Sequence, residues 1–180
     1  MTHDQEEAFE LADRVVVMGD GRIEQIGDAD QIHDHPASPF VARFMGATTE
    51  LPVTLRAGRV DAPGLDAARI ERRALPDGPA TLFLRPEDIT PIPDPSGCWT
   101  ITDINSTGTA LLLTLTDDQG RRIDSTLPRR LPEARALTKG TRVHLRPEGG
   151  AIFPGPRDAA APAGASALPQ PLPTPKENAR

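Results

Sequence analysis

The sequence has few of the side chains from which a nucleic-acid surface is built. Its 180 residues include five Phe, one Trp and no Tyr, and its formal net charge is −6. Proteins that bind nucleic acid present a basic groove to the phosphates and aromatic rings to the bases. An acidic chain with so few aromatic residues therefore argues against nucleic acid as a partner, and also against charge-driven binding to an anionic membrane surface.

Cysteine and long apolar runs are scarce as well. Cys98 is the only cysteine, which excludes a disulfide within the chain and a thiolate metal site. The acidic, polar residues 1–7 do not resemble a signal peptide. No apolar run approaches the roughly 20 residues of a membrane-spanning helix. These absences predict a cytoplasmic protein.

Charge and proline divide the chain into three parts. Residues 1–47 hold ten acidic and three basic residues, a net charge of −7, whereas residues 48–153 hold fourteen of each. Residues 154–180 contain seven prolines and few large apolar residues. Such a composition does not bury enough surface to offset the entropy of ordering the chain, so we expect a disordered tail from residue 154.

The first part predicts short helices around a hairpin. Helix-forming residues fill 4–12, a β-branched run occupies 14–18, and Asp20-Gly21 before an alternating segment is a hairpin signal. Asp28 and Ser38 are each placed to cap a short helix, the second with proline in its first turn.

From about residue 48 the pattern changes to short alternating segments separated by turns. The predicted strands are 81–85, 99–104, 109–116, 121–127 and 141–146. Several short strands without helical periodicity favour a small barrel or sandwich, and we predict a five-stranded barrel of the OB type. The expected class is therefore α+β, with a helix–hairpin–helix segment followed by this barrel.

Six stretches resemble one protein family. They are residues 2–8 (Thr-His-Asp-Gln-Glu-Glu-Ala), 11–18 (Leu-Ala-Asp-Arg-Val-Val-Val-Met), 21–27 (Gly-Arg-Ile-Glu-Gln-Ile-Gly), 39–46 (Pro-Phe-Val-Ala-Arg-Phe-Met-Gly), 82–89 (Leu-Phe-Leu-Arg-Pro-Glu-Asp-Ile) and 137–145 (Leu-Thr-Lys-Gly-Thr-Arg-Val-His-Leu). Together they are similar to the C-terminal part of ATP-binding subunits of ABC-type importers. The resemblance implies that 1–47 is the end of a nucleotide-binding domain and that 48–153 is the regulatory TOBE domain. In that family the first part packs against a sheet that lies upstream, so we expect partly bare apolar faces in this chain. They are Val15, Val16, Val17, Phe40 and Phe44. Residues 82–86 lean toward the sulfate/thiosulfate branch.

The resemblance also implies a role for one histidine. His3 matches the family's switch histidine, which reaches the γ-phosphate and attacking water of ATP held between two subunits, where a donor steadies the developing charge. Without the resemblance, a lone histidine beside a helix start is a surface or capping residue. His33, His35 and His144 offer no complete metal-ligand set. For Cys98, no activating base is identified, and packing is the preferred interpretation.

The motifs that hold ATP are missing from the sequence. A P-loop needs Gly-x-x-x-x-Gly-Lys-Ser/Thr, and the only two lysines, Lys139 and Lys176, do not follow a glycine. The Leu-Ser-Gly-Gly signature and the strand ending in Asp-Glu are absent too. ATP and Mg²⁺ are cofactors of the full-length family, but we expect none in this chain alone, and His3 would have no phosphate to contact.

The sequence thus predicts a truncated ATP-binding subunit of a solute importer that does not hydrolyse ATP alone. By resemblance, its partners are membrane subunits and a second ATP-binding subunit, which would place it on the inner face of the plasma membrane. One alternative is a stand-alone OB-type module that binds a small anion or has a regulatory role. Another is a non-functional gene remnant, and oligonucleotide binding is a distant last candidate.

Overall fold

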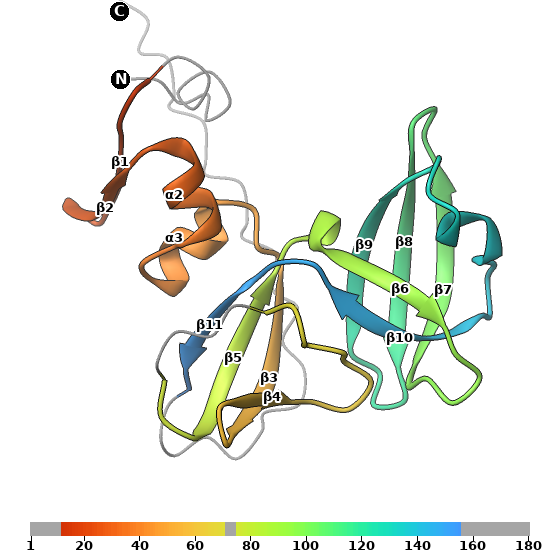
Figure 1. The fold of residues 1–180 in the computed structure, drawn as a ribbon. Coiled ribbons are helices and arrows are strands. Elements are labelled where there is room, and N and C mark those ends of the chain that lie inside the picture. The colour runs from red at the N-terminus through yellow and green to blue at the C-terminus, as the bar shows by residue number, and fades with distance from the viewer. Residues whose placement is uncertain (1–11, 71–74, 156–180) are drawn as a thin grey trace, which may run out of the picture.

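The computed structural model describes residues 12–70 and 75–155, and this part of the chain is mainly β-structure. A hairpin and two helices come first, and two larger sheets follow (Figure 1). The strands are β1 (Val15–Gly19), β2 (Arg22–Gly27), β3 (Thr49–Arg56), β4 (Arg59–Asp61), β5 (Gly78–Leu84), β6 (Ile89–Pro93), β7 (Trp99–Ser106), β8 (Ala110–Asp117), β9 (Arg122–Pro128), β10 (Arg142–Pro147) and β11 (Ala151–Pro154). The helices are α2 (Ala29–Asp34) and α3 (Pro39–Phe44), with 3₁₀ turns η1 (Pro86–Asp88) and η2 (Glu133–Ala136).

The predicted hairpin is confirmed, and its turn explains the sequence at its tip. β1 and β2 pair antiparallel, and the connecting residues Asp20 and Gly21 have φ angles of 47° and 74°. Two consecutive positive φ angles match the twist of the flanking strands, and Asp-Gly is a pair that tolerates them. The predicted helix over 4–12 lies almost wholly outside the described residues.

Both predicted helix caps are confirmed. The side chain of Asp28 accepts a hydrogen bond from Gln31 N at 2.7 Å, and Ser38 Oγ accepts one from Val41 N at 3.3 Å. Pro39 opens α3, where its missing N–H costs nothing. Each helix has only six residues, so tertiary contacts must supply most of its stability.

The two larger sheets differ from the predicted barrel. One has four strands in the order β11-β5-β3-β4, and the other has five in the order β6-β10-β7-β8-β9. The predicted strand 81–85 forms β5, which belongs to the four-stranded sheet, so its place in the five-stranded unit was wrong. β6 takes that place as an edge strand paired with β10.

Prolines explain several of the missed strands. β3 contains Pro52, and β6 contains Pro91 and Pro93, and neither segment was among the predicted strands. Proline has no backbone N–H, so within a sheet it occupies positions where no N–H is needed to bond the neighbouring strand. β6 is an edge strand and has a neighbour on one side only. β4 pairs with β3 only from Thr54 onward, so Pro52 needs no N–H to bond β4.

The two sheets share one apolar core. Its buried members include Trp99 and Leu145, at 1% and 0% exposure, and it draws side chains from strands of both sheets. The edges of the five-stranded sheet approach each other, because Ser125 Oγ on β9 donates to Ile89 O on β6 at 2.6 Å. A smaller cluster of Val17, Ile32 and Val41 joins the hairpin to the helices.

The predicted bare faces are confirmed in part. Val16 and Phe40 are 47% and 40% exposed, but Val17 is 2% exposed, so its expected exposure was wrong. Val17 points toward the helices, whereas the adjacent residues Val16 and Met18 point away from them. The predicted disordered tail lies outside the described residues except for its first two positions, and Pro154 ends β11.

Candidate functional site

His3 lies outside the described residues, so its surroundings stay a prediction. The other histidines make local contacts. His33 Nδ1 lies 2.9 Å from Asp34 Oδ1 on an exposed helix end, and His144 Nδ1 lies 3.6 Å from Asp94 Oδ2. Within residues 12–70 and 75–155, no three histidine, cysteine or acidic side chains come together in a way that fits a metal ion.

Asp94 is one of the carboxylates whose pKa is shifted. Hydrogen bonds from the hydroxyl and N–H of Ser96 lower the pKa of Asp94, and the nearby His144 adds to this effect. The contact joins the loop after β6 to β10. Both side chains are partly exposed, and a polar contact in such a position makes a small contribution to stability.

The arginines of the β8–β9 turn and of the end of β9 make different contacts. Arg121 Nε donates to Asp117 Oδ2 at 2.6 Å, and its guanidinium carbon lies 5.7 Å from the centre of the Trp99 ring. Asp117 is only 8% exposed, so this pair is part of a packed turn. Arg122 contacts Thr114 and Arg129 contacts Ser106, both at exposed positions.

Arg85 is the one buried positively charged residue in the described parts of the chain. The residue is 6% exposed, and three of its nitrogens are bonded. Nε donates to Met45 O at 2.8 Å and an Nη donates to His33 O at 2.5 Å. The other Nη donates to Asp88 Oδ2 at 3.2 Å. Two short helices and one 3₁₀ turn therefore converge on a single guanidinium.

The local sequence puts Arg85 where the chain leaves one sheet for the other. β5 ends at Leu84, Arg85 has extended backbone angles, and Pro86 starts η1. Asp88, three residues after Arg85, accepts from the guanidinium with its side chain, and its backbone carbonyl accepts from Glu148 N at 2.8 Å. The first crossing between the sheets, residues 85–88, is thereby bonded to the second crossing, residues 148–150.

The second crossing passes very close to β5. A Cβ on Gly150 would lie 2.7 Å from Leu84 Cδ2 and 2.9 Å from Phe83 O, and Gly150 has a φ of +139°. Both the space and the backbone angle require glycine there. Burial acts to raise the pKa of Glu148, but hydrogen bonds from Arg146 and Arg69 outweigh it and hold that pKa below its usual value.

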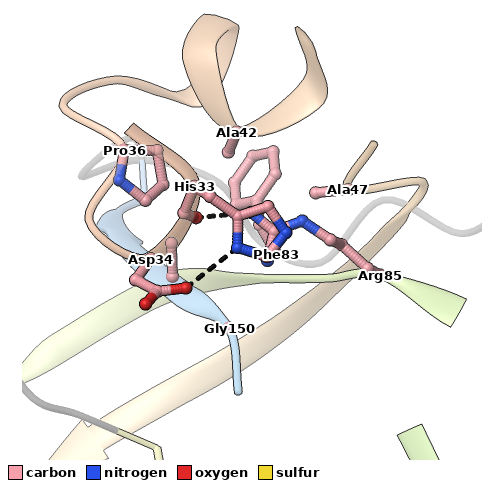
Figure 2. A pocket seen from close by; sticks show the side chains of 9 residues that line it. His33, Asp34, Pro36, Ala42, Ala47, Phe83, Arg85 and Gly150 are labelled. Atoms are coloured by element: carbon pink, nitrogen blue, oxygen red, sulfur yellow. Dashed lines mark hydrogen bonds and ion pairs between the residues drawn. The ribbon is translucent and has the colours of Figure 1, made fainter. Parts of the chain in front are cut away.

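A shallow pocket lies between this junction and the helices. Its empty volume is about 210 Å³ including solvent at its mouth. Figure 2 shows the bond from Arg85 to His33 and the contact between His33 and Asp34 on its wall. The lining residues are His33, Asp34, Pro36, Ala42, Ala47, Phe83, Arg85, Gly150 and Ala151.

The pocket beside Arg85 does not fit a nucleoside triphosphate. A phosphate site needs free cationic groups or a cradle of backbone N–H groups. Arg85 already donates to two carbonyls and a carboxylate, so it is not available to a phosphate.

Sequence reasoning missed the position of Arg85 as a structural junction. The residue was part of a recognised motif, but its contacts were not predicted. A charged residue after the apolar run 82–84 and before Pro86 was a usable signal, because a charge is buried only when it is paired. Its two carbonyl partners are 40 and 52 residues away in sequence, and no local pattern identifies them.

Comparison with known proteins confirms the resemblance to importer subunits. The "Sulfate/thiosulfate import ATP-binding protein CysA 1" of Rhizobium meliloti (strain 1021) is 44% identical over 157 residues, which cover 86% of this chain. The corresponding protein of Xanthomonas campestris pv. campestris is 37% identical over 157 residues, again 86% of this chain. One from Agrobacterium fabrum is 53% identical over 89 residues, or 49% of this chain.

The match covers only part of each relative. The aligned segment makes up 44% of the Rhizobium and Xanthomonas proteins and 25% of the Agrobacterium protein. The chain therefore spans less than half the length of these relatives. No protein-family model matches it. Among the described residues, no helix has the length and apolar character needed to cross a bilayer.

Proposed function

Most of this chain is homologous to ATP-binding subunits of ABC-type importers, and we propose that it serves as the part of such a subunit that follows the nucleotide site. The observation that carries the proposal is the 44% identity to a sulfate/thiosulfate import ATP-binding protein over 86% of this chain. A match of that length is too long to fit within either region alone. The hairpin–helix region and the two sheets thus share one ancestry.

Each of the two regions has its own proposed role. Residues 1–47 would be the end of a nucleotide-binding domain, and residues 48–153 would form an OB-like TOBE domain with a regulatory role. The Ser125–Ile89 hydrogen bond supports an OB-like interpretation, since it draws the two edge strands of the five-stranded sheet together. His3 would be the switch histidine of a nucleotide site whose other residues belong to parts of an ATP-binding subunit outside this sequence.

ATP hydrolysis by this chain alone does not fit its sequence. It contains no P-loop, and its two lysines lie at 139 and 176 in unrelated contexts. Without backbone N–H groups to cradle the phosphates, a histidine has no developing charge to steady. The proposed role is therefore that of one component of an importer complex. Its proposed partners are membrane subunits and a second ATP-binding subunit at the inner face of the membrane.

Sulfate or thiosulfate is the proposed transported solute. The named relatives are sulfate/thiosulfate import proteins, and the residues 82–86 lean the same way. The pocket beside Arg85 offers the solute no free cation, because the guanidinium already donates to two carbonyls and a carboxylate. The substrate proposal concerns the assembly to which the chain belongs.

Co-purification tests the proposal. The tagged chain is expressed with the membrane subunits of a sulfate importer, solubilised in detergent and recovered by its tag. We expect the membrane subunits to be enriched well above a tagged, unrelated protein of similar charge. His3→Ala is the matched variant, and it is expected to co-purify equally well, because a residue at the nucleotide should not hold the membrane subunits. Recovery of the membrane subunits at the level of the unrelated protein would refute the proposal.

A further inference from the structure

The apolar cluster between the helices and the sheets has four buried residues. The cluster between them contains Ala42 and Ala47 on the helix side and Phe83 and Phe153 on the sheet side. Alanine side chains bury little area, so this contact contributes modestly to holding the helices in place. Something else must fix two six-residue helices that would be marginal on their own.

The ion pair between Arg43 and Glu50 lies at the same boundary, but it is too exposed to fix the helices firmly. Arg43 Nε donates to Glu50 Oε1 at 2.6 Å, and this bond raises the pKa of Arg43. The Arg43 and Glu50 side chains are 55% and 39% exposed, however, so solvent screens the pair. The Arg43 guanidinium also lies 5.3 Å from the centre of the Phe83 ring, a contact of modest strength at such a site.

Arg85 makes the stronger connection, because its acceptors are helix-end carbonyls. The last carbonyls of a helix have no partner within it and carry a partial negative charge. His33 O lies in the last turn of α2 and Met45 is the C-cap of α3, and Arg85 donates to both. Bonds from a charged donor are among the stronger hydrogen bonds in proteins.

The same guanidinium reaches the crossing between the sheets. Its third bond goes to Asp88, whose backbone carbonyl accepts from Glu148 on the other crossing. The next residue, Ile89, accepts from Ser125 on the far edge of the five-stranded sheet. A continuous set of bonds thus runs from the ends of both helices, through Arg85 and Asp88, to the five-stranded sheet.

We propose that Arg85 is a coupling residue that fixes the orientation of α2 and α3 relative to the crossing between the two sheets. While its three bonds are made, the helices and the crossing move as one unit. When they are broken, the helices loosen and the five-stranded sheet keeps its own structure. This inference concerns contacts within the chain and does not rest on the importer assignment.

Lysine cannot replace arginine in this role. A planar guanidinium sends donors in several fixed directions, whereas an ammonium is a compact point charge at the end of a flexible stem. Arg85→Lys keeps the charge and the aliphatic stem but does not reach both carbonyls and Asp88 together. It is thus a mild variant that is expected to fold, and Arg85→Met is the more severe one because it leaves all three acceptors unpaired.

Amide hydrogen exchange on the whole chain tests the proposal. The reporters in the helices are His35 N and Met45 N, which donate to Gln31 O and Val41 O, and the reference amides are those of the β7–β8 ladder. In Arg85→Lys we expect the helix amides to exchange on the order of tenfold faster, as the loss of bonds to a charged group would produce. The β7–β8 amides should change by less than about twofold.

Arg43→Gln is the matched control, because it removes a cation at the same boundary. Its helix amides should stay within about threefold of the wild-type rates, as expected for an exposed pair. Unchanged helix exchange in both Arg85 variants would overturn the proposal. So would an equal acceleration of helix and β7–β8 amides, since that would make Arg85 a contributor to global stability and not a coupling residue.

Discussion

The hairpin–helix region and the two sheets use apolar side chains differently. In the first, one cluster of Val17, Ile32 and Val41 is buried, whereas the sheets share a core of 18 buried residues. Among the described residues, six large hydrophobic side chains are exposed, and five of them lie in the first region. They are Val16, Met18, Ile23, Ile26 and Phe40, and the sixth is Leu112.

This difference indicates which part of the chain can fold without a partner. Cross-strand pairs Val16–Ile26 and Met18–Ile23 leave one apolar face of the hairpin bare, while its other face packs on the helices. Contiguous exposed apolar surface of this kind marks association. We therefore expect the first region to need another protein surface to cover it, whereas the two sheets carry their own core.

The largest expected effect is a loss of unfolding free energy when the core shared by the two sheets is mutated. Leu145→Ala removes a fully buried side chain from the shared core and is expected to cost about 2–5 kcal/mol of unfolding free energy. Trp99, in the same cluster, reports the transition through its fluorescence in a urea titration. The loss comes from the removed contacts and from the cavity left behind.

Ile32→Ala is the matched control, because Ile32 is equally buried in the small cluster. It should shift the Trp99 transition by less than about 1 kcal/mol, since the small cluster is separate from the shared core and can open while the sheets stay folded. If Ile32→Ala lowered the Trp99 transition as much as Leu145→Ala, the regions would form one cooperative unit and the comparison would fail.

The second effect concerns association. We expect the purified chain to self-associate at high micromolar concentration through the bare hairpin face. The double variant Met18→Thr/Ile23→Thr should weaken this several-fold in sedimentation velocity, with a stability change of about 0.5 kcal/mol or less because both sites are exposed. Threonine keeps the strand preference, so the hairpin itself should persist.

Leu112→Thr serves as the comparison variant for this experiment. It removes the exposed large side chain of the five-stranded sheet and is expected to leave self-association unchanged. A wild-type chain that stays monomeric throughout, or a Leu112 variant with the larger effect, would contradict the assignment of the sticky surface to the hairpin.

The smallest effect lies at the crossing between the sheets and depends on pH. The pKa of Glu148 is lower in the folded protein than its usual value, so the stability it contributes is present above the unfolded pKa of about 4.3. That contribution is lost as the pH falls through the lower folded pKa. Glu148→Gln should therefore make the decline in stability between about pH 5 and 3 shallower, by less than about 1 kcal/mol.

Urea titrations at several pH values measure this change. Glu87→Gln, at an exposed position on the other crossing, is the control and should keep the wild-type slope. A Glu148→Gln variant with an unaltered acid slope would show that the arginine contacts at Glu148 contribute nothing to the junction.

Local signals in the sequence predicted local structure well. The Asp20-Gly21 turn and the Asp28 and Ser38 caps were identified because each depends on one or two neighbouring side chains. The alternating strands were found for the same reason. Pairing was harder, since β5 was assigned to the wrong sheet and the proline-containing strands β3 and β6 were missed.

The candidate site shows the same limit. The motif at 82–89 was recognised, but the contacts of Arg85 with His33 and Met45 join residues far apart in sequence. Such long-range bonds depend on how the crossing places β5 under the helices, and no periodicity within one segment encodes that. His3 remains a prediction of the resemblance alone.

The most direct test of the account is phosphate release from Mg-ATP by the purified 180-residue chain. The account predicts no release above that of buffer, and no difference between wild type and His3→Ala, because the chain has no P-loop to hold the nucleotide. Steady turnover by the wild-type chain alone, abolished in His3→Ala, would contradict it.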